Sequence, residues 1–357
     1  MSDYKAPYPW FGGKSRAAPL IWAALGDVTN YVEPFFGSGA ALLARPEKHA
    51  GKIETVNDAD GLLCNFWRAL SADTDAVAAH ADWPVSECDL SARHLWLVRE
   101  RASLTARLQT DPAFFDAKAA GWWVWGICSW IGSGWCSGDG PWSAEDGAWV
   151  SNAGQGRQLP HLSNAGQGIN RQLPHLGDAG RGINRQLPHL GDAGQGINRQ
   201  LPHLGDAGQG IAAWFASLAD RTRRVRVCCG DWSRVVTDSV THRHGLTGAF
   251  LDPPYPEGFN PDATYSGQDA SAADLWRDVV AWANEAGRRP DMRIVLAGYE
   301  GAGDTPAGWR CVPWKARGGY ATDATNSNRE RLWLSPACLS IDATRGVQVG
   351  FGFAPRP

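Results

Sequence analysis

The sequence predicts an α/β protein whose Rossmann-like sheet of parallel strands is interrupted by one long insertion. Three observations support this fold class. Short strand-like runs end in Gly or Asp, apolar stretches with helical spacing follow them, and the alternation stops at a block of tandem repeats and then resumes. The 357 residues, 43% of them hydrophobic, suffice for one large elaborated domain or for two domains.

The first part of the sheet is predicted from two strand–helix pairs. Gly-rich and acidic turns separate the elements, and apolar residues recur at helical spacing after each turn. The pattern indicates a strand over 31–35, a turn over 36–39, a helix over 40–44, a strand over 53–57 ending at Asp58, a helix over 61–70 and another over 90–108.

The alternation then stops at a segment rich in Trp and Gly, which is followed by tandem repeats. Three full units of 14 residues read Ser163 to Leu176, Gly177 to Leu190 and Gly191 to Leu204. Near-identical units favour a recently expanded, tolerant loop, since a packed solenoid needs distinct caps. We therefore expect residues 116–210 to form an insertion far longer than an ordinary loop.

The α/β pattern resumes after the repeats. It indicates a helix over 211–224, a strand over 225–229, a strand over 246–251, a helix over 272–286, and later strands over 293–297 and 331–334. The expected organisation is one catalytic domain made of residues 1–115 and 211–340, with a tail at 341–357.

Composition excludes several classes of protein. The net charge of −3 shows no overall basic balance, so a nucleic-acid surface would need local clusters of Arg and Lys. The eight cysteines never have Cys-x-x-Cys spacing, so we expect free thiols in a reducing cytoplasm and no metal site. Residues 119–136 lack charge but contain four glycines, so we expect no membrane span. The N-terminus has no signal-peptide pattern.

The strongest chemical motif is Asp252-Pro253-Pro254-Tyr255, at the end of a predicted strand. The lone pair of an exocyclic amino group is delocalised into its ring, so a catalyst must draw it out with acceptors. A carboxylate and a carbonyl held by proline would do so, and an aromatic ring would stack on a base flipped from the helix. The alternative is a plain turn, because Asp-Pro-Pro is good turn chemistry.

A second motif follows the first predicted strand and reads Glu33-Pro34-Phe35-Phe36-Gly37-Ser38-Gly39. Glycines at that place let a cofactor approach the backbone closely, although a simple left-handed turn would use them equally. About twenty residues on, Asn57-Asp58 ends the second strand, where an acid typically receives ribose hydroxyls. Asp60 is the competing acid, and an N-cap is the structural alternative for both.

Two further segments complete the pattern. Gly230-Asp231-Trp232 follows another predicted strand. Asp231 there would accept a hydrogen bond from the adenine amino group of a cofactor, and Trp232 would cover the adenine ring. The alternative is that Asp231 is only the N-cap of the following helix. Near the N-terminus, Trp10-Phe11-Gly12-Gly13-Lys14 offers a close backbone approach and a lysine for a carboxylate group.

Together these segments resemble the Dam-like (alpha-group) DNA adenine-N6 methyltransferases, in particular phage- or prophage-encoded members. The resemblance covers about residues 5–75 and 210–340 and implies a Rossmann-like methyltransferase sheet, S-adenosylmethionine as methyl donor, base flipping and a DNA substrate, double-stranded or alternatively single-stranded. It assigns catalysis to Asp252, Pro253, Pro254 and Tyr255, and cofactor binding to Trp10, Lys14, Glu33, Pro34, Phe35, Gly37, Gly39, Asp58, Asp231 and Trp232.

The middle of the chain departs from the family, since the typical helical recognition domain is not evident. Candidate DNA contacts there are Trp135, Arg171 and Arg185, through stacking and phosphate contacts. For most tryptophans of residues 122–149, a place in the core is the favoured alternative. The competing functions are methylation of RNA adenine or of a protein glutamine, and an inactive methyltransferase-like protein that binds nucleic acid.

Overall fold

The computed structural model describes most of the chain outside the repeats. The described residues are 4–10, 13–46, 52–130, 135–136, 142–145, 148–151, 210–255, 272–301, 303–314 and 329–341. Residues 152–209, which contain the full repeats, and 342–357 of the predicted tail lie outside this part.

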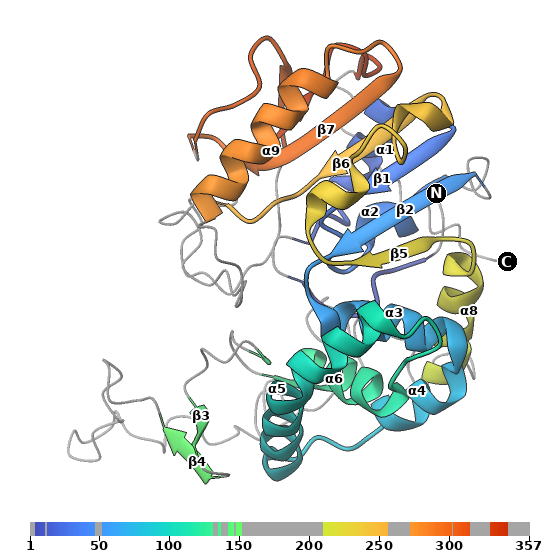
Figure 1. Cartoon of the computed structure of the whole chain (residues 1–357), viewed down its shortest axis with the longest axis vertical. Coiled ribbons are helices and arrows are strands. Elements are labelled where there is room, and N and C mark those ends of the chain that lie inside the picture. The colour runs from blue at the N-terminus through green and yellow to red at the C-terminus, as the bar shows by residue number, and fades with distance from the viewer. Residues whose placement is uncertain are drawn as a thin grey trace, which may run out of the picture.

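A seven-stranded, mostly parallel sheet forms the centre of the molecule (Figure 1). Its order is β5-β2-β1-β6-β7-β9-β8, and only β9 runs against its neighbours. The strands are β1 (Asn30–Glu33), β2 (Ile53–Asp58), β5 (Arg226–Cys229), β6 (Thr247–Leu251), β7 (Met292–Tyr299), β8 (Arg310–Pro313) and β9 (Glu330–Leu334). The predicted Rossmann-like α/β fold is thereby confirmed.

The middle strands are buried on both faces, as expected for parallel strands covered by helices. Every residue of β1 and of β6 is buried. The helix α9 (Ala272–Ala286) lies in front of the sheet in Figure 1, and α1 (Ala18–Leu25) and α2 (Ala40–Leu43) lie behind it.

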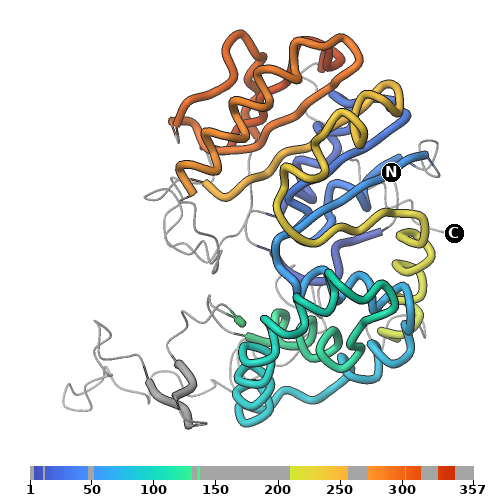
Figure 2. The backbone as a smooth tube through the Cα atoms, in the orientation of Figure 1, coloured from blue at the N-terminus to red at the C-terminus, as the bar shows by residue number. Residues whose placement is uncertain are grey.

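The strand order reverses between β1 and β6. From β1 the chain continues outward to β2, whereas β6 lies on the other side of β1 and leads outward to β7 (Figure 2). At such a reversal the loops that follow the two central strands diverge and leave a crevice at their carboxyl ends. The glycine turn after β1 and Asp252 after β6 both lie at this crevice.

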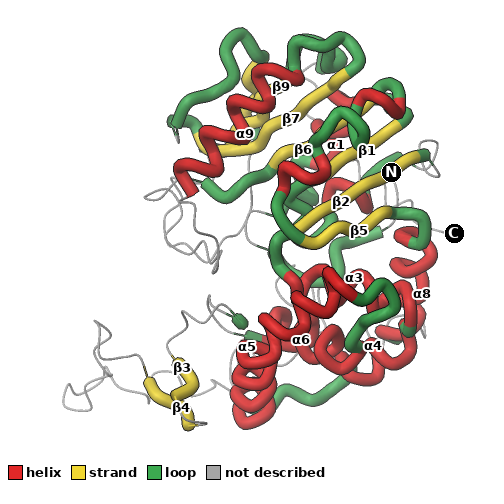
Figure 3. Tube along the Cα trace, viewed as in Figure 1, coloured by secondary structure: helices red, strands yellow, loops and turns green. Residues whose placement is uncertain are grey.

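A cluster of helices packs beside the β5 end of the sheet (Figure 3). It contains α3 (Gly61–Ala72), α4 (Thr74–Ala81), α5 (Glu87–Thr110), α6 (Ala117–Ser129) and α8 (Ile211–Thr222). Acidic or hydroxyl side chains cap four of these helices at their N-termini: Asp60, Asp73, Ser86 and Asp116.

The sequence pattern missed part of this cluster, although α3, α5 and α8 agree with their predicted ranges. The helix α6 belongs to the Trp/Gly segment that was expected to lie in the insertion, yet it packs against both α3 and α4. Gly121 allows the contact with α4, because a Cβ there would overlap His80, and Gly126 leaves room for the Trp135 ring. A small antiparallel hairpin follows, of β3 (Trp142–Glu145) and β4 (Ala148–Ser151).

Several predicted core tryptophans are confirmed. Trp123 and Trp125 are each 2% exposed and lie in the main hydrophobic core. In the part of the chain that the structure describes, no helix combines the length and the apolar character needed to cross a bilayer.

Candidate active site at the strand-order reversal

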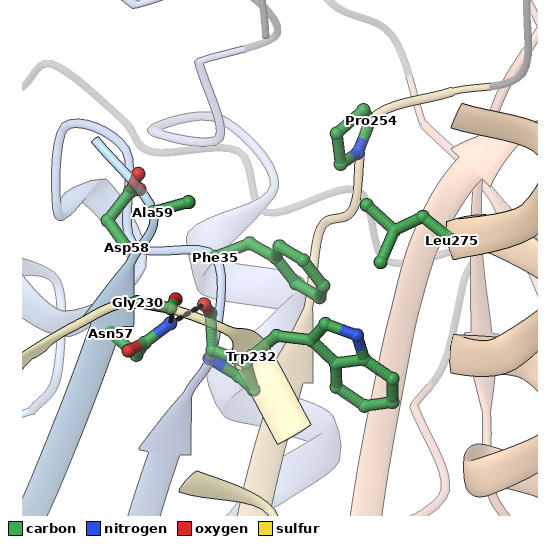
Figure 4. Close-up of a pocket in the computed structure, with 9 residues that line it drawn as sticks. Phe35, Asn57, Asp58, Ala59, Gly230, Trp232, Pro254 and Leu275 are labelled. Atoms are coloured by element: carbon green, nitrogen blue, oxygen red, sulfur yellow. Dashed lines mark hydrogen bonds between the residues drawn. The ribbon is translucent and has the colours of Figure 1, made fainter. Parts of the chain in front are cut away.

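A pocket opens at the carboxyl ends of the central strands (Figure 4). Segments far apart in the chain line it: Pro34, Phe35, Asn57, Asp58, Ala59, Gly230, Trp232, Pro254 and Leu275. The turn after β1, the end of β2, the turn after β5 and the motif after β6 therefore share one cavity. The sequence assigned five of these residues to binding or catalysis.

The glycine turn after β1 has the left-handed backbone of the structural alternative, and its contact with a cofactor stays a prediction. Gly37 has φ +50° and Gly39 has φ +71°. The Gly37 amide donates a hydrogen bond to Asp58 Oδ2 at 2.9 Å, and the Tyr8 hydroxyl donates to the Gly37 carbonyl at 2.9 Å. A Cβ on Gly37 would lie 2.6 Å from Nε1 of Trp10, so only glycine leaves room for this indole.

The structure separates the two acids that competed for the ribose position. Asp58 lines the pocket and accepts hydrogen bonds from the amides of Gly37 and Asp60, the latter at 3.0 Å. Asp60 instead caps α3 by accepting from the Leu62 amide at 2.9 Å, and it pairs with Arg101 at 3.0 Å. Burial raises the pKa of Asp58 to about 6, although the backbone donors oppose that shift.

Asn57 joins three strand ends, a role that the sequence pattern did not reveal. Its Nδ2 donates to the Pro34 carbonyl at 3.1 Å and to the Gly230 carbonyl at 2.9 Å, as Figure 4 shows. Among the described residues, its buried Oδ1 has no hydrogen-bond partner. The side chain thus fixes the spacing of the turns that form the pocket.

The segment after β5 contributes an aromatic wall. Trp232 stacks with Phe35, with ring centroids 6.0 Å apart and 26° between the planes. Asp231 caps the short 3-10 helix η4 (Trp232–Val235) by accepting from the Ser233 amide at 2.9 Å, and it also accepts from the Ser233 hydroxyl. The N-cap alternative for Asp231 is therefore realised in this structure, and its contact with a cofactor stays a prediction.

The predicted catalytic motif forms an ion pair with the N-terminal segment. Lys14 Nζ lies 2.9 Å from Asp252 Oδ2 and donates to the Tyr255 hydroxyl at 3.3 Å. The Lys14 side chain is 5% exposed, whereas that of Asp252 is 20% exposed. Burial lowers the pKa of Lys14, but its attraction to Asp252 and Glu330 outweighs burial and leaves the pKa raised. Lys14 therefore supports the catalytic motif, and its predicted contact with a carboxylate of the cofactor stays a prediction.

Tyr255 lies between two carboxyl groups. Its hydroxyl is 3.5 Å from Asp252 Oδ1 and 3.3 Å from Glu330 Oε2. The ring packs against Tyr299, with centroids 4.4 Å apart, and edge-on against Trp276 at 6.3 Å. In this structure the ring predicted to stack on a flipped base belongs to a buried hydrophobic cluster that also contains Trp276, Tyr299 and Trp333.

Glu330, the first residue of β9, was not predicted as a site residue. It is 2% exposed, and the register of β9 on β7 pairs it with Tyr299. Burial is the main reason that the pKa of Glu330 is raised to about 7. The negative charge of Asp252 adds to this shift, whereas the positive charge of Lys14 opposes it. A pKa so close to neutrality is typical of a group that exchanges protons in a site.

The remaining predicted residues lie at different places. Glu33, at the end of β1, is 2% exposed and accepts a hydrogen bond from the Tyr31 hydroxyl at 2.9 Å. It is not among the residues that line the pocket. Burial raises the pKa of Glu33 well above its ordinary value. Trp135 donates to the Trp123 carbonyl at 3.1 Å and packs on α6, as a core residue would. Arg171 and Arg185 lie outside the described residues.

The described residues contain no group of three or more His, Cys, Asp or Glu side chains placed to hold a metal ion.

Comparison with known proteins identifies the N-terminal part of the chain. Residues 10–84 match the model of the D12 class N6 adenine-specific DNA methyltransferases. The match includes Trp10, Lys14, the glycine turn and Asp58, and it confirms the resemblance to an adenine-specific DNA methyltransferase family. No curated protein matches the chain.

Proposed function

Because residues 10–84 carry a domain of the N6 adenine-specific DNA methyltransferases, we propose that the protein transfers a methyl group from S-adenosylmethionine to the exocyclic amino group of adenine in DNA. One observation carries this proposal. Pro254, from the catalytic motif, lines the same pocket as Phe35 and Asp58, which follow β1 and β2. In this proposal the acceptor groups Asp252 and Pro253, which directly precede Pro254, act beside the cofactor segments, as methyl transfer requires.

The pocket residues fit a nucleoside cofactor. Phe35, Trp232 and Leu275 supply an apolar and aromatic wall for an adenine ring, and Asp58 supplies a carboxylate for ribose hydroxyls. Gly37 leaves room for the indole of Trp10, which we also propose as a cofactor residue. When bound, S-adenosylmethionine supplies an electrophilic methyl group on its sulfonium sulfur. In this proposal Asp231 and the backbone of Glu33, Pro34 and Gly39 complete the cofactor site.

The catalytic motif can draw out the lone pair of an adenine amino group. Lys14 engages Oδ2 of Asp252, which leaves Oδ1 to accept a hydrogen bond from N6. The ammonium group also favours the ionised form of Asp252, against the burial that raises its pKa. The carbonyl of Pro253 is the second acceptor, since proline removes the competing backbone donors. With both N–H bonds engaged, electron density stays on N6 as the methyl group is transferred.

The target base must leave the duplex to reach this site, because N6 of a stacked and paired adenine is not accessible to Asp252. We propose that the protein flips the base into this site, with Tyr255 beside it. Trp135 and the repeat arginines Arg171 and Arg185 are the proposed DNA contacts.

The test is methyl transfer with labelled cofactor to unmethylated double-stranded DNA, single-stranded DNA and RNA, followed by mapping of the modified bases. We expect N6-methyladenine in DNA. Asp252→Ala should abolish transfer while cofactor binding, measured by calorimetry, survives. Asp278→Ala is the matched control, because it removes an exposed carboxylate on α9. Full activity of Asp252→Ala would refute the assignment, and transfer only to RNA or to protein would redirect it.

A further inference from the structure

The hydroxyl of Tyr255 connects two carboxyl groups of unequal accessibility. It lies 3.5 Å from Asp252 Oδ1 on one side and 3.3 Å from Glu330 Oε2 on the other, and it accepts from Lys14 Nζ at 3.3 Å. A phenol carries one hydrogen, so it donates to one carboxylate at a time. When it donates to Glu330, its lone pair can accept a proton from Asp252.

Accessibility assigns different tasks to the two acids. Asp252 keeps 20% of its side-chain surface exposed, so a substrate amino group can reach it. Glu330 is 2% exposed behind Tyr255, so the base cannot contact it directly. Among the described hydrogen bonds, those of the Tyr255 hydroxyl link Glu330 to Asp252 and offer a path for a proton.

The charges of the cluster favour uptake of one proton. The Lys14 ammonium and the two carboxylates of Asp252 and Glu330 leave one negative charge in excess when all three are ionised. Burial makes such an excess costly. Lys14 forms an ion pair with Asp252 at 2.9 Å and opposes a proton there, whereas its attraction to Glu330 is the smaller of the two. Glu330 is thus the more favourable place for the added proton.

We propose that Glu330 is the terminal acceptor of the proton that leaves adenine N6, and that the proton reaches it through Asp252 and the Tyr255 hydroxyl. This inference rests on the proposed function. As the new N6–CH3 bond forms, N6 gains positive charge and holds one N–H proton in excess, and loss of this proton in the same step lets its acceptor influence the rate of transfer. That N–H bond breaks, its electron pair returns to N6, and the proton binds Asp252 Oδ1. Asp252 then passes a proton to the Tyr255 oxygen as the Tyr255 O–H proton moves to Glu330 Oε2, which restores Asp252 and Tyr255.

Other groups that face Glu330 do not provide the same function. Burial raises the pKa of Tyr299 to about 12, so this phenol stays neutral. On β9 itself, Arg331 donates to the Glu330 carbonyl and pairs with Glu300. Arg329, the residue directly before β9, donates a hydrogen bond to the Glu300 carbonyl.

Glu33 and Asp58 are the remaining buried acids of this region. Glu33 bonds to Tyr31 and acts on Asp252 only by charge. Asp58 is held by backbone amides at the end of β2. Neither forms a described hydrogen bond with Tyr255, so the hydroxyl bridge is specific to Glu330 and Asp252.

The experiment measures single-turnover methyl transfer to DNA from about pH 5.5 to about pH 9 for the whole protein. Glu330→Gln keeps the size and hydrogen-bonding capacity of the side chain but cannot take the proton, and Tyr255→Phe keeps the ring but removes the bridge. Glu300→Gln is the matched control, because it neutralises an exposed acid that pairs with Arg331. A second readout needs no turnover: infrared difference spectra of the cofactor-free protein follow the C=O band of protonated carboxyl groups against pH.

For the unaltered protein and Glu300→Gln we expect the rate to rise with pH through about 7, since only ionised Glu330 can accept the proton. In Glu330→Gln and Tyr255→Phe the rise should disappear, and the rate at pH 8 should fall at least about tenfold, a modest general-base effect. The carboxyl band that titrates near neutrality should be missing from Glu330→Gln.

Each outcome decides between the proposals. If the unaltered protein methylates DNA and Glu330→Gln keeps both its pH profile and the band, the relay is wrong and the proposed function stands. If Glu330→Gln does not fold, an unchanged profile in Tyr255→Phe overturns the relay, and a lost rise supports it. If the unaltered protein transfers no methyl group to adenine in DNA, the proposed function fails and the relay falls with it.

Discussion

Replacing Gly37 with alanine perturbs the cofactor side of the pocket by one methyl group. The backbone at φ +50° is left-handed, which costs an L-residue about 1–2 kcal/mol. The new Cβ would also lie 2.6 Å from Nε1 and 2.7 Å from Cδ1 of Trp10, so the indole must move. Crowding of this kind typically adds about 1–3 kcal/mol. We therefore expect Gly37→Ala to lower the free energy of unfolding by about 2–5 kcal/mol.

Gly308→Ala separates the two contributions. Gly308 has a similar backbone, with φ +76°, but a Cβ there would meet nothing within 4 Å. This control should lose only the strain of about 1–2 kcal/mol and no cofactor affinity. Urea unfolding gives the stabilities, and isothermal calorimetry gives the affinity for S-adenosylmethionine, which should fall at least about tenfold in Gly37→Ala, or about 1.4 kcal/mol. Equal losses of stability in both variants, with unchanged cofactor binding, would refute the role of close backbone approach at Gly37.

Three further outcomes follow from the packing and charges. Folding raises the pKa of Glu330 from 4.5 to about 7, so between these pH values the folded protein holds a proton that the unfolded chain has lost. The free energy of unfolding should therefore fall by up to about 3 kcal/mol as the pH rises from 4.5 to 7. Urea titrations at several pH values should show this slope for the unaltered protein and a flatter one for Glu330→Gln. Deleting residues 177–204, two whole repeat units, should leave methyl transfer intact, because added loop length is thermodynamically cheap; loss of activity would show that every copy is needed. The Arg93 guanidinium lies 4.2 to 5.3 Å from the centroids of three tryptophan rings. Arg93→Ala should therefore lower the free energy of unfolding by about 2–4 kcal/mol, which a lower melting temperature would reveal, without changing the transfer rate per folded molecule.

The sequence predicted the strands that carry the site because their signals are local. The motif at Asp252 and the turn at Gly37 each end an apolar run, and parallel strands bring their carboxyl ends to one edge of a sheet. The fold class and the lining of the pocket by Phe35, Asp58 and Trp232 could therefore be anticipated.

No comparable local signal marked Glu330 as a site residue. It is separated from Tyr255 by 75 residues, and only the antiparallel register of β9 on β7 brings the two together. In a predicted strand, a glutamate followed by Arg and Leu is typical of a solvent-exposed position at the edge of a sheet. The helix α6 was missed for a different reason: its tryptophans and glycines are buried on several sides, so no single apolar face marks it.

The ion pair between Lys14 and the catalytic motif has a consequence for biosynthesis. The lysine and Tyr255 are 241 positions apart, and Glu330 follows still later. During translation, the ribosome therefore releases the first wall of the pocket long before the groups that we propose perform the chemistry. A nascent chain that has folded β1 and β2 already contains the segment proposed to bind the nucleoside, whereas the proposed reactivity requires the last strands to dock. Contacts of such long range also slow folding, which prolongs the exposure of apolar surface in the maturing polypeptide.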